Sequence, residues 1–173
     1  MIKNEKNERL GTILGILLTI TILISGSAVA VWHYARVITL NDDTTNEVEI
    51  LYAPDDVHAT LGENGPPKAL GFVVVDLGVS HEIPHNTEFW VFATPGAFYN
   101  NYKPEEYQVA VGESSDSFEL VGGDDDQGDH VFTTPNKPGN LYRYILITGT
   151  DGEKGAGDSN YGPEVDAVGW EDP

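Results

Sequence analysis

Hydrophobic and polar positions follow two different patterns along the chain. Residues 10–35 contain no side chain that is charged at neutral pH, and their most apolar part is residues 13–24. After residue 40 no helical period is found, and short runs rich in β-branched and aromatic residues alternate with clusters of turn-forming residues. Runs of this length and spacing are typical of a β-sandwich or barrel. The expected strands cover residues 48–52, 71–77, 88–93, 107–111, 118–121, 130–133 and 142–148.

Two of these runs are apolar at every position. They are residues 72–75, Phe-Val-Val-Val, and residues 89–92, Phe-Trp-Val-Phe. A continuously apolar strand is typical of the centre of a fold, where both faces of the strand are covered. We therefore expect Trp90, Phe92 and Tyr144 to lie in the core.

The N-terminal apolar segment fits two kinds of export signal. Residues 10–32 are long enough to cross the ~30 Å hydrocarbon core of a bilayer as a helix, and Trp32 and Tyr34 would then be aromatic anchors at the outer interface. The same segment also ends in Ala-Val-Ala, which fits a signal peptide cleaved after Ala30. Both interpretations place the rest of the chain outside the cell or on its surface.

The same segment sets the expected domain organisation. Three basic residues precede it and only Arg36 closely follows it, so the N-terminus stays in the cytoplasm if the anchor is retained. The apolar run that begins at Gly11 also resembles, weakly, the hydrophobic helix of archaeal pilins, which would pack in a filament core. We expect three parts: an anchor or signal segment at 1–36, a polar linker at 37–47 and one β-sandwich at 48–173.

The charge balance excludes two classes of partner. The 173 residues include 28 acidic and nine basic side chains, for a formal net charge of −19. Binding of nucleic acid, or of an anionic membrane surface, needs clustered Lys and Arg, so neither is expected. The chain has no cysteine, which excludes disulfides, thiolate metal sites and cysteine nucleophiles.

Six segments in sequence order resemble a known family. Residues 70–78 read Leu-Gly-Phe-Val-Val-Val-Asp-Leu-Gly, and residues 141–148 read Leu-Tyr-Arg-Tyr-Ile-Leu-Ile-Thr. With residues 53–62, 89–96, 107–122 and 162–168, they resemble the galactose-binding-like (discoidin-like) jelly-roll domains of microbial surface proteins. The resemblance implies an eight-stranded antiparallel β-sandwich whose loops at one end bind ligands. Many members of that family are not enzymes.

Catalytic motifs lack the context that their chemistry needs. His81-Glu82-Ile83-Pro84-His85 has the spacing of a zinc protease motif, but that motif requires a helix and Pro84 disfavours one. No Gly-x-Ser-x-Gly turn is present to expose a serine nucleophile. We expect no catalytic residue, and an enzyme would require a metal at His81 and His85.

Calcium is the expected inorganic ligand, because loops supply the carboxylate and carbonyl oxygens that it takes. The resemblance implies that the first and last strands lie side by side, which would bring one set of carboxylates onto a single structural ion: Asp55, Asp56, Glu164 and Asp166. A second candidate set lies in the Gly-rich acidic loop: Asp124, Asp126 and Asp129. Both loops also fit an acidic, solvated surface adapted to high salt.

The segment Phe-Tyr-Asn-Asn-Tyr at residues 98–102 is the candidate ligand-binding loop. Its rings could stack on a sugar face while its amides bind hydroxyls: Tyr99, Asn100, Asn101 and Tyr102. The expected function is a non-catalytic extracellular module that binds carbohydrate or a surface protein, with a membrane contact only through the N-terminal helix. The alternative is a self-associating subunit of an extracellular filament or surface layer.

Overall fold

The computed structural model describes residues 30–42, 44, 47–55, 57, 59–62, 70–93, 106–125, 128–150 and 162–172, apart from the side chains of Val48 and Glu49. Almost all of the regular structure in these residues is β. The strands are β1 (Val31–Tyr34), β2 (Val37–Asp42), β3 (Ala59–Thr60), β4 (Phe72–Asp76), β5 (Ile83–Pro84), β6 (Glu88–Ala93), β7 (Glu106–Ser114), β8 (Ser117–Asp125), β9 (His130–Thr133), β10 (Leu141–Tyr142), β11 (Tyr144–Gly149) and β12 (Glu164–Asp172). A short 3-10 helix, η1 (Glu47–Ile50), follows β2.

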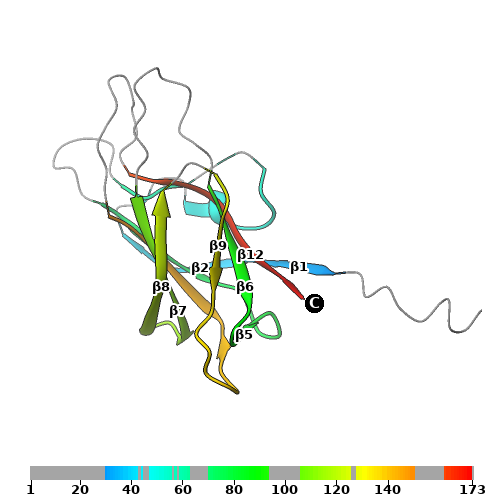
Figure 1. Ribbon diagram of the computed structural model, residues 1–173. Coiled ribbons are helices and arrows are strands. Elements are labelled where there is room, and N and C mark those ends of the chain that lie inside the picture. The colour runs from blue at the N-terminus through cyan, green and yellow to red at the C-terminus, as the bar shows by residue number, and fades with distance from the viewer. Residues whose placement is uncertain are drawn as a thin grey trace, which may run out of the picture. The chain divides into compact units, whose positions relative to one another are not determined.

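The strands pair in two antiparallel five-stranded sheets (Figure 1). The first sheet has the order β1-β12-β6-β9, with β3 beside β12, and the second has the order β2-β4-β11-β7-β8. A further short pair joins β10 to β5. The first and last strands lie side by side, from Val31 opposite Asp172 to Tyr34 opposite Gly169. The predicted all-β sandwich is therefore confirmed.

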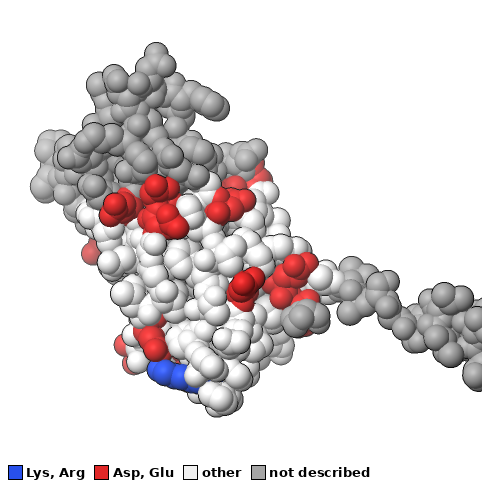
Figure 2. All heavy atoms as spheres, in the orientation of Figure 1, with Lys and Arg blue, Asp and Glu red and all other residues white. Residues whose placement is uncertain are grey.

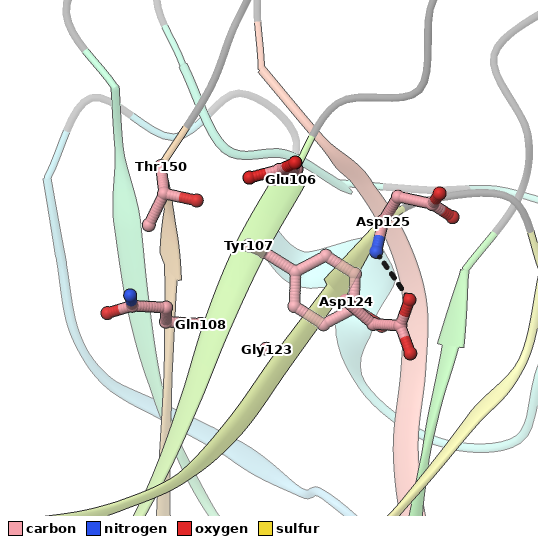
Figure 3. Close-up of a pocket in the computed structure, with 7 residues that line it drawn as sticks. All are labelled: Glu106, Tyr107, Gln108, Gly123, Asp124, Asp125 and Thr150. Atoms are coloured by element: carbon pink, nitrogen blue, oxygen red, sulfur yellow. Dashed lines mark hydrogen bonds between the residues drawn. The ribbon is translucent and has the colours of Figure 1, made fainter.

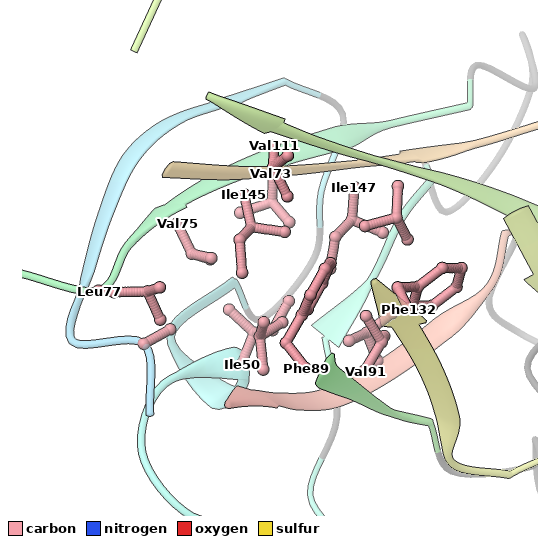
Figure 4. Packing of buried hydrophobic residues seen from close by; sticks show 14 of the residues in the cluster. Ile50, Val73, Val75, Leu77, Phe89, Val91, Val111, Phe132, Ile145 and Ile147 are labelled. Atoms are coloured by element: carbon pink, nitrogen blue, oxygen red, sulfur yellow. The ribbon is translucent and has the colours of Figure 1, made fainter. Parts of the chain in front are cut away.

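One hydrophobic core lies between the two sheets (Figure 4). Phe89 and Val91 of β6 enter it from the first sheet, and Val73, Ile145 and Ile147 enter it from the second, all with no exposed surface. Their neighbours along β6 and β11 are only partly buried, since successive side chains of a strand point to opposite faces. The alternation therefore selects which residues build the core.

The two continuously apolar runs behave differently in the structure. Strand β4 is buried on both faces, as predicted, with Val73, Val74 and Val75 each at most 1% exposed. Strand β6 is buried on one face only, because Trp90 and Phe92 lie on the outer face of the first sheet and are partly exposed. The prediction that both faces of residues 89–92 are covered by the core is wrong.

Neighbouring rings explain why apolar residues occur on that outer face. Trp32 of β1 lies edge-on to Trp90, with ring centroids 5.0 Å apart, and its centroid is 5.8 Å from that of Phe92. Between them β12 presents Gly169, where an added Cβ would lie 2.6 Å from the Tyr34 ring. The rings of β1 and β6 thus close over a glycine. Tyr144, also expected in the core, is partly exposed on the second sheet.

The sandwich begins earlier than the sequence suggested. Strands β1 and β2 lie within residues 31–42, which we had assigned to the anchor and the linker, and they pair with β12 and β4. Trp32 and Tyr34 are therefore sheet residues rather than membrane anchors. Residues 1–29, which hold most of the expected helix, lie outside the described residues. Within the described part of the chain, no helix has the length and apolar character to cross a bilayer.

Candidate functional site

A pocket of about 400 Å³ lies at the Glu106 end of β7 (Figure 3). It is built by the end of β7, the end of β8 and the residue after β11, because Glu106 and Tyr107 pair with Asp125 and Asp124 across the two strands. Its lining is Glu106, Tyr107, Gln108, Gly123, Asp124, Asp125 and Thr150. Three carboxylates at one opening give this end of the sandwich a negative potential.

Beside this pocket, the ring of His130 lies between two carboxylates. Its Nδ1 is 2.8 Å from Oδ2 of Asp124, and its Nε2 is 3.8 Å from Oδ1 of Asp125. Nε2 is buried and has no hydrogen-bond partner among the described residues. A carboxylate on one ring nitrogen orients an imidazole so that the other nitrogen can bind a metal. Among the described residues, Asp124, Asp125 and His130 form a group whose possible metal-ligand atoms all lie within 4.8 Å of one another.

The second predicted calcium set is only partly brought together. Asp124 belongs to the cluster with His130, but its companions there are Asp125 and the histidine, which the sequence reading did not include. Asp129 is exposed and is not in the cluster, and Asp126 lies outside the described residues. The difference arises because β8 extends to Asp125, so Asp124, which was expected in a loop, is a strand residue opposite Tyr107 of β7.

The first predicted calcium set lies where the loop before β3 meets β12. The backbone N–H of Asp55 donates to Oδ1 of Asp166 over 3.2 Å, so the two segments are in contact. Glu164 and Asp166 are buried, at 4% and 3% exposed. The carboxylate of Asp55 accepts from the N–H of Val57 over 3.1 Å. Asp56 lies outside the described residues, and calcium binding by this set stays a prediction.

The zinc-protease spacing at residues 81–85 does not form a helix. His81 lies in a turn and Ile83–Pro84 is strand β5, so the two histidines do not share a helical face. Nδ1 of His81 instead lies 2.7 Å from Nδ1 of His33 on β1, and the His81 carbonyl accepts from Nε1 of Trp170. Burial lowers the pKa of His81, and the nearby Arg36 charge lowers it further. This histidine pair joins β1 to the chain after β4.

The remaining predicted site residues, Tyr99, Asn100, Asn101 and Tyr102, lie outside the described residues. The segment that contains them connects β6 to the Glu106 end of β7. Sequence reasoning missed His130 and Asp125. Their signal was weak, because a histidine in a strand and an aspartate in an acidic run are both common.

The sequence matches no protein-family model and no curated protein. Its fold, however, is similar to solved structures of carbohydrate-binding modules. The chitosan-binding module 1 of a chitosanase/glucanase from Paenibacillus sp. IK-5 matches with a TM-score of 0.52 and 13% identity, over 82% of this chain and 97% of the module. The module CBM32-3 of a family 31 glycoside hydrolase from Clostridium perfringens matches with a TM-score of 0.54 and 11% identity, over 86% and 98%.

A third similar structure contains a bound sugar. The C. perfringens module CpGH89CBM32-4, solved in complex with GlcNAc-α-1,4-galactose, has a TM-score of 0.51 and 11% identity, over 85% of this chain and 97% of that one. At these identities the likeness establishes the fold. The described part of the chain therefore has the β-sandwich fold of these modules, in agreement with the resemblance found in the sequence.

Proposed function

We propose that this chain is a non-catalytic carbohydrate-binding module displayed outside the cell. The observation that carries the proposal is the extent of the fold match, which covers 97% or 98% of three separate carbohydrate-binding modules. The whole unit that binds sugar in those proteins thus has a counterpart here. The N-terminal apolar segment would direct export, either as an anchor or as a cleaved signal.

The charge of the chain narrows the class of sugar. A net charge of −19 repels polyanions, so uronic acid polymers and sulfated glycans are poor ligands. On the face shown in Figure 2, acidic side chains occur in several groups, whereas basic side chains occur at one end only. Neutral sugars do not experience this repulsion. We therefore propose a ligand without negative charge.

The first prediction concerns the candidate loop. If Tyr99 stacks on a sugar ring, Tyr99→Ala should weaken binding of a neutral glycan by about tenfold, the equivalent of about 1.4 kcal/mol. The measurement is a glycan-array screen of the full chain, followed by titration calorimetry with the strongest neutral hit. Tyr52→Ala is the matched control, because Tyr52 is a loop tyrosine with 65% exposure outside this segment.

Two results would contradict this proposal. Equal binding by wild type and by Tyr99→Ala would show that the loop at residues 98–102 does not bind the sugar through Tyr99. Absence of signal for every neutral glycan would contradict the carbohydrate-binding function. Polymers in negative-stain micrographs of the same sample would then favour the alternative, a filament subunit.

We also propose that a structural calcium ion links the Asp55 loop to β12. Two buried carboxylates on β12 and the contact of Asp55 with Asp166 support an ion at this place. Calcium that binds only the folded state stabilises it by about 2.7 kcal/mol at a hundredfold excess over Kd. Millimolar CaCl₂ should therefore raise the melting temperature of the full chain above its value in EDTA. Asp166→Asn should abolish the increase.

The control for this experiment separates binding from screening. Asp172→Asn changes an exposed carboxylate at the end of the same strand and should keep the calcium response. If KCl at equal ionic strength raises the melting temperature as much as CaCl₂ does, the acidic loops act through their charge alone and the calcium site is excluded.

A further inference from the structure

A second pocket, of about 630 Å³, lies at the Ser114 end of β7, the opposite end of that strand from Glu106. Its volume is within the range of small-molecule sites. The walls come from the β7–β8 hairpin and from the segment between β9 and β10. Its lining is Val111, Gly112, Glu113, Ser114, Ser117, Phe118, Glu119, Lys137, Asn140 and Tyr142.

Backbone hydrogen bonds hold both walls in place. Asn140 N–H donates to the Lys137 carbonyl over 3.0 Å, and Lys137 N–H donates to the Pro135 carbonyl over 2.9 Å. The hydroxyl of Thr134 donates to the Pro84 carbonyl over 2.7 Å, which fixes the start of this segment on β5. On the hairpin side, a Cβ at Gly112 would lie 2.5 Å from the Ser117 carbonyl oxygen, so glycine allows the close turn. The pocket is therefore preformed.

Two side-chain bridges cross the pocket from one wall to the other. Nδ2 of Asn140 donates to Oε1 of Glu113 over 2.6 Å, and the ammonium of Lys137 pairs with the carboxylate of Glu119. The hydrogen bond that Lys137 donates to Glu119 raises the pKa of Lys137; burial opposes this, and the charges of Glu119, the Tyr142 phenol and Glu113 raise it further. Donors and acceptors from both walls thus converge on one place.

The hydroxyl of Tyr142 is the unusual group in this pocket. Tyr142 is 2% exposed, and its hydroxyl is buried with no hydrogen-bond partner among the described residues. An unpaired buried hydroxyl is unfavourable, and a ligand group that binds it would remove that cost. The side chain of Lys137 can move aside to admit a ligand, because it is 55% exposed and its exposed ion pair with Glu119 is weak.

We propose that this pocket is a second saccharide subsite that takes one neutral sugar unit, an inference that rests on the proposed carbohydrate-binding function. Each sugar hydroxyl both donates and accepts, which matches a lining that has an ammonium and an amide beside two carboxylates. The partly exposed ring of Phe118 offers an apolar surface for the carbon face of a sugar. Glu113 and Glu119 leave the lining with a net negative charge despite Lys137, which disfavours an anionic sugar.

The test uses the neutral disaccharide N,N′-diacetylchitobiose and amide chemical shifts of the full ¹⁵N-labelled chain. We expect amides of residues 112–119 and 137–142 to shift together on titration. A digalacturonate, as an anionic probe, should shift them less. Tyr142→Phe should weaken binding at these amides by about fivefold or more, a change of about 1 kcal/mol. Tyr144→Phe, two residues along on the outer face, should leave it unchanged.

A readout without sugar separates this role from a structural one. Because the Tyr142 hydroxyl has no hydrogen-bond partner among the residues that the structure describes, Tyr142→Phe should leave the melting temperature unchanged or raise it. A lower melting temperature would show that the hydroxyl is already paired and would overturn the inference. Binding that shifts only amides near the Glu106 end would also overturn it, while the carbohydrate-binding function would stand. Absence of any shift with both probes would overturn the subsite, and the glycan array decides the function separately.

Discussion

Phe89→Ala should lower the free energy of unfolding by about 3–5 kcal/mol, because it removes a large side chain from the middle of the core. Phe89 has no exposed surface, and its ring lies 5.8 Å from that of Phe132 on the neighbouring strand β9. The other sheet packs above it, so the fold can close the cavity only in part. Urea unfolding of the full chain, followed by tryptophan fluorescence, measures the effect.

The next residue along β6 supplies the control. Trp90 is larger than Phe89 but lies on the outer face, where it is partly exposed and contacts Trp32. Trp90→Ala should therefore cost less than Phe89→Ala, although it removes more atoms. If the two losses are equal, or if Trp90→Ala costs more, the assignment of the two faces of β6 is wrong.

Asp76→Asn should lower the free energy of unfolding by about 2–3 kcal/mol, since hydrogen bonds to charged groups contribute more than neutral ones. Asp76, at the end of β4, accepts from Nε and Nη2 of Arg143, each over 2.7 Å, and from the N–H of Gly78 over 2.7 Å. Its side chain is 11% exposed. The asparagine keeps the size of the side chain but loses its charge and one of its two acceptors.

The effect should depend on pH. Burial by itself would raise the pKa of Asp76, but the hydrogen bonds from Arg143 and Gly78 and the Arg143 charge outweigh it and lower the pKa. A carboxyl with a lowered pKa in the folded state stabilises the fold above its unfolded pKa of about 3.9 and loses that contribution as the pH falls through the folded value.

The difference in stability between wild type and Asp76→Asn should therefore be constant from pH 7 to 5 and shrink below about pH 4. Asp116→Asn, in the exposed turn between β7 and β8, should cost little at any pH. A difference that persists at full size at pH 2 would exclude the charge of Asp76 as the cause.

Much of the site lies beyond what sequence patterns can predict. The Tyr142 pocket combines β7, β8, β10 and the segment before β10, and its lining residues have no common spacing in the sequence. The same holds for His33 and His81, whose ring nitrogens lie 2.7 Å apart although 48 positions separate them. Such contacts depend on which strands become neighbours, and local pattern carries no information about that.

Local pattern, by contrast, determined the fold class. The short apolar runs, the turn residues between them and the absence of a helical period after residue 40 predicted a β-sandwich or barrel, because short strands separated by turns are typical of both. The resemblance to galactose-binding-like domains then implied the antiparallel sandwich. The net charge of −19 argued against nucleic acid and anionic membranes as partners, and the lack of cysteine excluded disulfides and thiolate chemistry. Net charge, residue counts and the spacing of apolar residues can be read from the sequence without knowing which residues are in contact.

Only the tertiary structure decided where the sandwich begins and which apolar residues are core. Residues 31–34 continue the N-terminal apolar run in the sequence, but they form an edge strand beside β12. Trp90 and Phe92 are as apolar as Phe89, yet the alternation along β6 places them on the outer face, where Trp32 of β1 covers them in part. The burial of a side chain depends on which strands pair beside it. In the first sheet β1 and β12, from opposite ends of the described chain, pair with each other, and β12 also pairs with β6.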